Sequence, residues 1–360
     1  MGKRLKLISK LLSKLPNNSF LRGRLIKTRK EYNKLIRYKK VTWKNNLLKQ
    51  LEKMQTTNSY LGTIINKTGN FKQNNTFLKK KGMRASFSLI NGLGTNINLS
   101  SLIKIFEKVV EPILLYNCEI TQAFIPNNWS YSKFKDNIWI QGDQINKVVH
   151  SFLRQILGVG KTTSTWGILT ETGKYPLIMK IYIQIMKYWV RLLSIKSKYL
   201  QEAHMHYIKQ WHTNKNSWCK IIYYLLTYTD MRQNFNLEEI ISKPKIFIEK
   251  FKHRITSKYQ HYWKQELNSK KESKLDFYKT IKKNYYFEQY LDVLDKEKRL
   301  PITRIRMSNH NFPIERMRYM KIKRDQRICS ICNLRQIGDE IHYLSYCKNK
   351  NIEEKEKIHR

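Results

Sequence analysis

Acidic residues are scarce in this sequence. Its 360 residues include only 27 Asp and Glu against 70 Lys and Arg, which leaves a formal net charge of +43. Internal ion pairs cannot balance so large an excess, and the remaining charge repels itself and destabilises the compact state. Hydrophobic residues make up 41% and aromatic residues 12% of the chain, so it is not a disordered basic tail and can fill two or three small cores. The expected partner is therefore a polyanion, with RNA or DNA as the leading candidates.

Cysteines and long hydrophobic runs are scarce as well. Five cysteines in 360 residues, an odd number, argue against a secreted disulfide scaffold. No run of about 18 apolar residues exists, so we expect no membrane-spanning segment. Reduced thiols and the lack of a secretory signal predict residence in the nucleus or cytoplasm. A mitochondrial transit peptide is the alternative for the first 30 residues, which contain no acidic residue but are rich in Lys and poor in Ser.

Residues that would form a catalytic centre are missing. A two-metal polymerase or nuclease needs clustered carboxylates that hold two ions about 3.5–4 Å apart, and the sequence contains no Asp-Asp pair. It also contains no P-loop, no GxGxxG motif and no credible Ser/His/Asp set. We therefore assign no catalytic residue and no small-molecule substrate, and we expect no enzymatic activity from this chain by itself.

Helical periodicity is the main pattern that is present. Within residues 99–195, a helix that begins near Asp143 ends at Gly158, which stands where a left-handed C-terminal cap is expected. In residues 177–193 the polar positions form one stripe, so this helix is predicted to be buried except for a basic edge of Lys180, Gln184, Lys187 and Arg191. Residues 60–71 predict a short strand and a Gly-containing turn. The predicted fold class is mainly α, with a short β-hairpin near residues 60–72.

Basic residues concentrate in particular segments. Residues 1–57 contain 17 Lys and Arg and only two acids, in two patterns typical of basic amphipathic helices. Such a segment is either a solvated helical face or an arm along a phosphate backbone. In residues 250–290 lysines alternate with Tyr and Trp, which indicates either phosphate contacts with base stacking or aromatic core positions beside a solvated face. The candidate nucleic-acid contacts are Lys27, Arg29, Lys30, Arg37, Lys39, Lys40, Lys180, Lys187, Arg191, Lys282, Lys283, Arg324 and Arg327.

The C-terminal cysteines form the sharpest motif. Cys329 and Cys332 are followed by His342 and Cys347 in the pattern C-x2-C-x9-H-x4-C. Zinc favours four soft or borderline ligands in a tetrahedron, and two close pairs supply such a set. Because all four ligands come from the protein, no coordination position stays open for catalysis, so the predicted Zn²⁺ is structural. The alternative is a group of ordinary buried or redox cysteines.

The residues around this motif predict how it is supported. Gly338 and Asp339 look like the start of a short helix that presents His342, with Ile341 and Leu344 facing a small core. We also expect neighbouring cations to stabilise the thiolates, namely Arg324, Arg327, Arg335 and Lys348.

A series of motifs, taken in order, resembles the C-terminal part of LINE-type (non-LTR) retrotransposon reverse transcriptases. The family has a strand and turn at the end of its palm, a PILLYGSE helix, an FLRxILGV segment, a GELGRYPL segment, a KYW triplet and a closing CxxC…EDExHFLxxC zinc motif. The similar segments here are YLGT at 60–63 with GNF at 69–71, VEPILLYNCE at 110–119, FLRQILGV at 152–159, TETGKYPL at 170–177, KYW at 187–189, and DEIHYL at 339–344 within residues 327–347.

The resemblance covers residues 58–350 and implies a helical thumb-like bundle, a connector and a zinc domain that hold template RNA or target DNA. The family's Tyr/Phe-x-Asp-Asp signature and endonuclease residues are absent, Asn117 stands at the usual Gly, and no Trp follows Glu119. The implied domains are a basic helical arm or linker at 1–57, a strand–turn remnant of the palm end at 58–98, a thumb-like domain at 99–195, a basic, aromatic-rich helical connector at 196–300 and a CCHC zinc-binding domain at 301–360.

Three functions stay open at this point. The chain is a nucleic-acid-binding part of a reverse transcriptase without its catalytic core, a polymerase subunit active only with a palm supplied in trans, or a domesticated zinc-dependent interaction protein. Steep salt dependence of nucleic-acid affinity is expected of the first, primer extension after complementation of the second, and salt-resistant partner binding of the third. RNA and DNA both stay open as partners, as does the oligomeric state.

Overall fold

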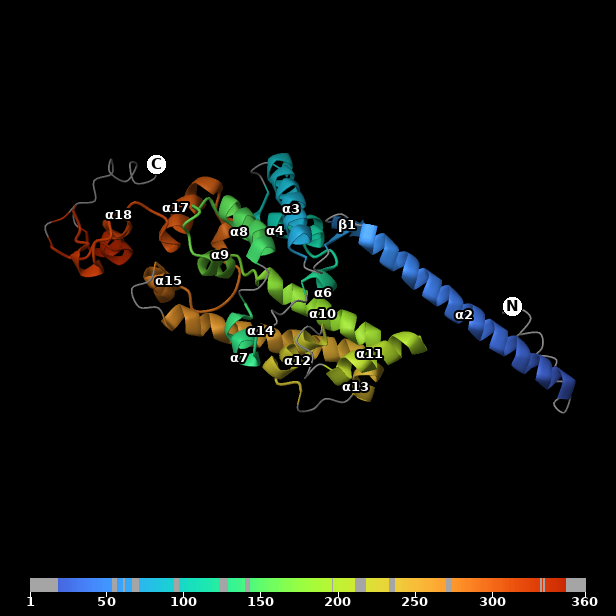
Figure 1. Cartoon of the computed structure of the whole chain (residues 1–360). Helices are drawn as coiled ribbons and strands as arrows, with labels where there is room; N and C mark the ends of the chain where they lie inside the picture. Colours follow the sequence, from blue (N-terminus) through green and yellow to red (C-terminus); the bar gives the residue numbers. More distant parts are fainter. Residues whose placement is uncertain are drawn as a thin grey trace. The chain divides into compact units, whose positions relative to one another are not determined.

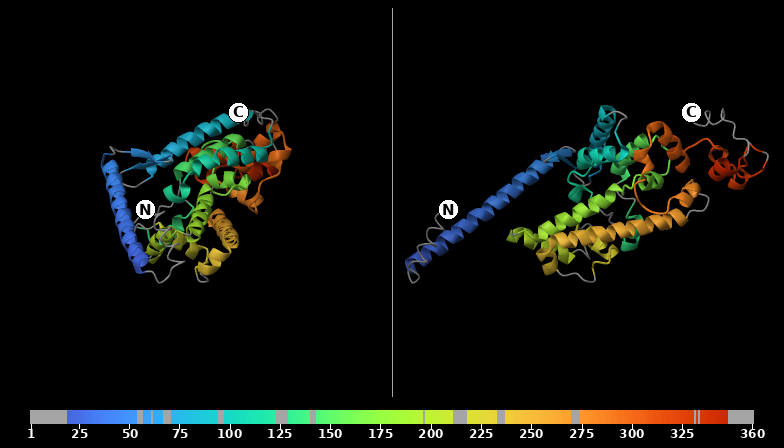
Figure 2. Two further views of the ribbon diagram at one scale, coloured as in Figure 1. Left: turned by 90° about the vertical axis from the view of Figure 1, so that its right-hand side faces the viewer. Right: turned by 180° about the vertical axis from the view of Figure 1, so that it is seen from behind.

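The structure is a computed structural model, in which helices make up most of the described chain (Figure 1, Figure 2). The predicted mainly α fold class is therefore confirmed. The chain divides into two compact units, Met1–Asn70 and Phe71–Arg360. The structure describes residues 19–53, 57–60, 62–66, 71–93, 97–122, 129–139, 143–195, 197–210, 218–232, 237–269, 274–330, 332 and 334–347.

The first unit contains a long helix and a hairpin. α2 (Ser19–Lys53) precedes the antiparallel strands β1 (Thr57–Tyr60) and β2 (Thr63–Asn66). Gly62 lies in the turn with a φ of 79°, a left-handed conformation that favours glycine. The predicted hairpin is thus present but begins at Thr57, because Gly62 turns the chain where one continuous strand was expected. The expected helix over residues 5–15 lies outside the described residues.

The described side chains of α2 do not form a buried face. Ile26, Tyr38 and Val41 are exposed, and no described side chain of this helix is buried. Four of the predicted phosphate contacts on α2 are exposed as well, while the side chains of Lys39 and Lys40 lie outside the described set. The exposed four are Lys27, Arg29, Lys30 and Arg37.

The second unit consists of helices. In chain order they are α3 (Lys72–Leu93), α4 (Leu99–Val109), α5 (Glu111–Leu114), α6 (Cys118–Thr121), α7 (Tyr131–Asn137), α8 (Asp143–Leu157), α9 (Thr165–Glu171), α10 (Leu177–Leu193), α11 (Lys198–Gln210), α12 (Cys219–Tyr228), α13 (Leu237–Ser242), α14 (Pro244–Ser269), α15 (Asp276–Ile281), α16 (Tyr290–Val293), α17 (Lys296–Arg306), α18 (Pro313–Tyr319), the 3-10 helix η1 (Arg324–Gln326) and the π-helix η2 (His342–Tyr346). We call α3 to α17 the helical body, and residues 308–347 the metal module.

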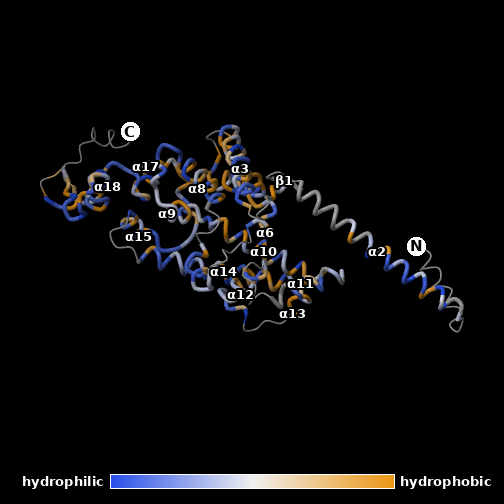
Figure 3. The backbone as a smooth tube through the Cα atoms, viewed as in Figure 1, coloured by the Kyte–Doolittle hydropathy of each residue, from blue (hydrophilic) through white to orange (hydrophobic). Residues whose placement is uncertain are grey.

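The periodic segments fold as their patterns predict. α8 ends at Leu157, and Gly158 follows with a φ of 66°, as a left-handed cap requires. α10 spans Leu177–Leu193 and buries ten of its side chains, while Gln184, Lys187 and Arg191 are exposed along one edge. Figure 3 shows the hydrophobic stretches of α8 and α10 within the helical body. Both helix predictions are confirmed.

α3 departs from the expectation for residues 58–98. The resemblance implies only a strand and turn there, but residues 72–93 form a helix that packs against α8 and α5. The buried positions of α3 are Asn74, Leu78, Gly82 and Ser86. A Cβ atom at Gly82 would lie 2.4 Å from the Leu114 side chain, so α3 approaches α5 closely at this residue.

Two apolar cores hold the helical body together. One contains side chains of α7, α10, α12 and α14 packed around Trp189 and Tyr259. In this core α10 and α14, which are far apart in sequence, lie side by side (Figure 1, Figure 2). The other joins α4, α8 and α9 to the C-terminal end of α14 and to residues 275–307. Each core draws side chains from both 99–195 and 196–300, the ranges expected as a thumb-like domain and a connector.

A buried carboxylate ties α9 to the chain that precedes the metal module. Glu171 is fully buried, and Arg306 reaches it with both a 2.5 Å contact from Nε and a 3.2 Å contact from a terminal nitrogen. Tyr278 and Tyr290 donate their hydroxyl protons to the same carboxylate at 2.8 and 2.6 Å. Burial and the Glu171 charge raise the pKa of Tyr290, so it stays a hydrogen-bond donor.

Candidate metal centre

The four predicted ligands meet in one buried cluster. Cys329, Cys332, His342 and Cys347 are each buried, and their ligand atoms all lie within 4.8 Å of one another. The Sγ atoms of Cys329 and Cys347 are 4.0 Å apart, and Cys332 Sγ lies 3.2 Å from His342 Nε2. Metal–sulfur bonds of about 2.3 Å and metal–nitrogen bonds of about 2.0 Å in a tetrahedron give ligand separations close to these. The arrangement could therefore hold one metal ion.

A hairpin-like loop positions the first ligand pair. Ile328 and Ile337 form an antiparallel bridge, and the N–H of Cys329 donates to the carbonyl of Gln336 at 2.8 Å. Gly338 follows the bridge, where an added Cβ would lie 2.9 Å from Pro313 and 3.1 Å from Cys329. Gly338 thus packs closely against both the CxxC loop and the start of α18.

A π-turn positions the second pair. The N–H of Cys347 donates to the carbonyl of His342 at 2.8 Å, which closes the i→i+5 turn of η2. Such a turn brings residues five apart to one face, as the H-x4-C spacing requires. The Asp339 carboxylate accepts the N–H of His342 at 2.8 Å and caps the start of this element. The predicted short helix after Gly338 is therefore confirmed, in a π form.

Gln336 orients the histidine ligand. Its Oε1 atom lies 3.1 Å from His342 Nδ1. An amide oxygen only accepts hydrogen bonds, so this contact places the ring proton on Nδ1 and leaves the lone pair of Nε2 facing the thiols. Backbone hydrogen bonding from Leu334 lowers the pKa of Cys332, whereas burial and the neighbouring Cys329 raise the pKa of Cys347 to about 11.

The small core beside the cluster differs from the prediction. Phe312, Ile314 and Tyr343 form it, and the Phe312 and Tyr343 rings lie 4.0 Å apart. Ile341 and Leu344 were expected there, but they are 41% and 46% exposed. The reason is the π-turn, which directs Tyr343 inward and breaks the three-residue spacing on which that prediction rests.

The basic residues near the cluster bond mainly to other protein groups. Arg324 pairs with Asp276 at 3.1 Å, and Arg327 donates to the backbone carbonyl of Ile322 at 2.9 Å. Arg316 reaches the CxxC loop, where it donates to the Ser330 hydroxyl at 3.3 Å. Lys348 lies outside the described residues.

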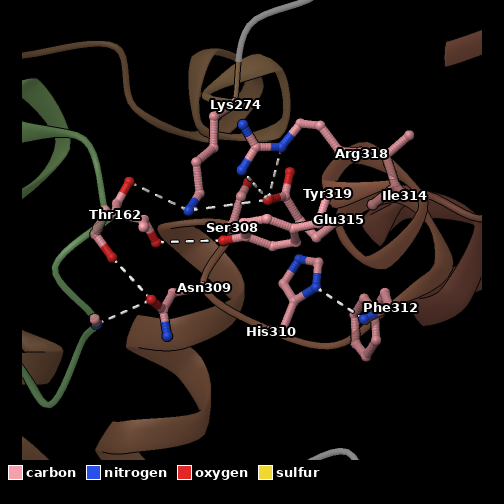
Figure 4. A network of polar contacts seen from close by, with 12 residues as sticks. Thr162, Lys274, Ser308, Asn309, His310, Phe312, Ile314, Glu315, Arg318 and Tyr319 are labelled. Atoms are coloured by element: carbon pink, nitrogen blue, oxygen red, sulfur yellow. Dashed lines mark hydrogen bonds and ion pairs between the residues drawn. The ribbon is translucent and has the colours of Figure 1, made fainter. Parts of the chain in front are cut away.

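A polar network attaches the metal module to the helical body (Figure 4). Asn309 accepts hydrogen bonds from the Gly160 backbone and the Thr163 hydroxyl, both at 2.9 Å. Lys274 contacts the Thr162 carbonyl at 3.4 Å and the Glu315 carboxylate at 3.9 Å, which joins the body to α18.

A second set of contacts lies on the module side of this network. His310 binds Glu340 at 2.9 Å through Nε2 and accepts the Phe312 N–H through Nδ1. Burial acts to raise the pKa of Glu340, but the hydrogen bonds from His310 and Ser308 outweigh it, so the pKa stays below its usual value. Both ring nitrogens of His310 are therefore engaged within the protein.

The remaining predicted contacts divide into exposed and internally paired cations. Lys187, Arg191 and Lys283 are exposed. Lys180 pairs with Glu111 and Glu107 at the edge of α10, so its charge is balanced within the fold. Lys282 was predicted as a phosphate contact, but it is buried and pairs with Glu288 at 2.5 Å, which removes it from the candidate interface.

The aromatic residues of 250–290 are mainly core residues. Tyr259, Trp263 and Tyr278 are buried in the two cores, whereas Tyr286 is exposed. Of the two interpretations of that segment, the structure supports aromatic core positions beside a solvated face.

No family model, curated protein or solved structure matches this chain. Among the described residues, no helix is both long enough and apolar enough to cross a bilayer. The metal cluster is thus the feature of the structure with the most specific chemistry.

Proposed function

We propose that the chain is the nucleic-acid-binding, C-terminal part of a LINE-type reverse transcriptase without its catalytic core. The observation that carries the proposal is the closed Cys3His cluster, since its ligands occupy the positions of the family's terminal zinc motif. The net charge of +43 supports a polyanionic partner.

The metal in this proposal is a structural Zn²⁺. Three thiolates and one imidazole form a donor set that zinc favours, and Cys329, Cys332, His342 and Cys347 would fill all four tetrahedral positions. No position would stay open for a water molecule or substrate. The metal would supply folding free energy to the module rather than a reactive group.

Nucleic acid in this proposal contacts exposed cations of both units. On α10 the relevant side chains are Lys187 and Arg191, which share one edge of an otherwise buried helix. On α2 they are Lys27, Arg29, Lys30 and Arg37. Each phosphate contact on duplex DNA releases counterions, so log K falls with log salt by about 0.9 per contact.

The test measures the affinity of the full chain for a labelled duplex over a series of salt concentrations. We expect a steep negative slope, and we expect the double variant K187Q/R191Q to reduce its magnitude by about 1.8. The exposed Lys298 on α17 is the matched control, since K298Q removes a charge outside the candidate interface. A flat salt response of the wild-type chain would overturn the proposal.

One observation favours a second candidate, a zinc-dependent protein-interaction module. Ile341, Leu344 and Tyr346 are exposed apolar side chains of the metal module. This candidate predicts binding of a protein partner that survives high salt, combined with a flat salt response toward nucleic acid.

A further inference from the structure

The long helix α2 exposes its charges to solvent. It is one continuous helix from Ser19 to Lys53 (Figure 1), and none of its described side chains is buried. Its sequence contains only two acids, Glu31 and Glu52. Six exposed cations of this helix have no side-chain partner among the described residues, namely Arg22, Lys27, Arg29, Lys30, Lys34 and Arg37.

These cations repel one another along the helix. Lys27, Lys30 and Lys34 are three and four residues apart, and Arg37 follows after three more. Residues at these spacings are neighbours on a helix surface, where like charges are destabilising. No described side chain of α2 is buried, so packing of these residues does not compensate for the repulsion. A bound polyanion would neutralise the charges and thereby stabilise the helix.

Four of the cations form two rows on opposite flanks of α2. Each residue of an α-helix turns by about 100°. Arg22 and Arg29, which are seven residues apart, therefore form one row, the Arg row, and Lys27 and Lys34 form a second, the Lys row. The two rows are about 120–160° apart around the helix. A helix that lies on a single phosphate backbone would leave one of the two rows unused.

The residues between the two rows are fit to contact base edges. We call them the middle arc, which consists of Ile26, Lys30, Asn33 and Arg37, all of them exposed. Arg and Lys bind guanine in the major groove, Asn binds adenine, and apolar side chains contact the thymine methyl group. Glu31, the acid in this part of the helix, lies about 120° away from the centre of the arc.

The dimensions of α2 match the major groove of B-form DNA. An α-helix with its side chains is about 10–12 Å in diameter, and that groove is about 12 Å wide. The groove has a phosphate backbone on each wall and base edges on its floor, so it meets both rows and the middle arc at once. In an A-form RNA duplex the major groove is too deep and narrow for side chains to read.

We propose that α2 lies in the major groove of a DNA duplex. The Arg row contacts the backbone on one wall, the Lys row contacts the backbone on the other, and the middle arc faces the base edges. The inference rests on the proposed function and sharpens it, because it assigns duplex DNA rather than RNA to the first unit.

The experiment measures the affinity of the full chain for three labelled duplexes of equal charge and matched sequence, each of about 20 base pairs, or two helical turns. One is unmodified DNA, the second is DNA whose cytosines are replaced by glucosylated 5-hydroxymethylcytosine, which fills the major groove, and the third is RNA. Fluorescence anisotropy at one salt concentration gives the three affinities. We expect the wild-type chain to bind unmodified DNA at least about tenfold more tightly than either of the others, because only its groove admits the helix.

A double variant links this preference to the middle arc. K30Q/R37Q removes both cations of the arc and should reduce the preference for unmodified over glucosylated DNA at least about threefold. The matched control is K245Q/K250Q, which removes two exposed cations of α14 and should leave the preference unchanged. Since no described side chain of α2 is buried, K30Q/R37Q should fold like the wild type, which circular-dichroism melting curves verify.

A second double variant tests the two rows. K27Q/R29Q removes one cation from each row. It should lower the magnitude of the salt slope by about 1.8 on unmodified DNA and leave the slope on glucosylated DNA unchanged.

The outcomes separate this inference from the function on which it rests. Equal wild-type affinity for unmodified and glucosylated DNA, or for the DNA and RNA duplexes, would overturn binding in the major groove while salt-dependent binding stands. A preference that K30Q/R37Q leaves intact would overturn it as well. A flat salt response of the wild-type chain toward all three duplexes would instead overturn the proposed function.

Discussion

The helical body and the metal module are built in different ways. The body fills two apolar cores with large side chains such as Trp189, Trp263 and Tyr182. Among its described residues, the module has a core of three buried hydrophobic side chains, Phe312, Ile314 and Tyr343, beside the four candidate ligands. Burial of apolar area scales with domain size, so a core of this size cannot offset the entropy of ordering about forty residues. We therefore expect the body to fold on packing alone and the module to depend on a bound metal ion.

The largest expected effect follows from removing a ligand. In C332S one thiolate is lost, and the module loses most of a metal-binding free energy of about 10–16 kcal/mol. We expect the wild-type chain to carry one Zn²⁺ by elemental analysis and C332S to carry none. Limited proteolysis should then cut residues 308–347 of the variant while the helical body stays intact.

Cys219 provides the matched control for this variant. It is buried in α12, far along the chain from the ligand motif. C219A should keep one Zn²⁺ per chain and an intact module. If chelation left the module as protected from proteases as before, the metal would not be what stabilises it.

A smaller effect is expected from the charge inside the body. E171Q keeps the shape of the side chain but removes the fully buried of the two carboxylates that pair with Arg306, so that Glu288 alone balances the guanidinium. Breaking a buried pair on one side typically reduces stability by about 3–5 kcal/mol. Urea unfolding should show this loss, while metal content stays at the wild-type value.

The exposed Glu297 on α17 serves as the control for E171Q. E297Q should change the free energy of unfolding by less than about 0.5 kcal/mol. An E171Q chain as stable as the wild type would mean that the carboxylate is not a fixed anchor between α9 and α17.

The third prediction concerns Gln336, which contacts the ring of the candidate ligand His342. Q336A removes the 3.1 Å contact with His342 Nδ1 but leaves all four ligands in place. Loss of such a partner reduces metal affinity about 10- to 100-fold. Competition with a chelator of known affinity measures the change, and Q326A in the neighbouring η1 is the control. Equal affinities of Q336A and wild type would exclude an orienting role.

Local patterns predict much of this structure. The bounds of α10 and the cap at Gly158 follow from apolar periodicity and glycine chemistry, and the ligand set follows from cysteine spacing. α3 was missed because its buried face is made of Asn74, Gly82 and Ser86 as well as Leu78, so hydropathy gives little signal. Close approach to α5 depends on those small side chains, and that contact lies outside any local window.

The burial and pairing of charged side chains were the features least predictable from the sequence. Lys282 has the same sequence signature as exposed lysines, yet the loop after α15 folds back and buries it against Glu288. Glu171 and Arg306 meet from positions 135 residues apart, and nothing local indicates that pair. Similarly, the exposure of Ile341 follows from a π-turn that the spacing of apolar residues does not show.

The smallest expected effect tests whether ion pairs at the edge of the body matter at all. Burial acts to raise the pKa of Glu107, but Lys174 and Lys180 outweigh it and hold the pKa below its usual value. A carboxyl group whose pKa is lower in the folded than in the unfolded chain stabilises the fold above the unfolded pKa, here 4.5. This stabilisation is lost as the pH falls through the lowered pKa of the folded state. E107Q should therefore be less stable than wild type at pH 7, and the difference should shrink as the pH falls below 4.5 and through the lowered pKa.

The magnitude of this difference is small because Glu107 is 32% exposed and solvent screens its charge. We expect about 1 kcal/mol or less at pH 7 by urea unfolding. E249Q is the control. The Glu249 side chain is 70% exposed and pairs with Lys252, so E249Q should leave the free energy of unfolding unchanged at either pH. If E107Q stayed less stable than wild type at low pH, the effect would come from lost packing rather than lost charge. The ion pairs of Glu107 would then contribute nothing to the stability of the helical body.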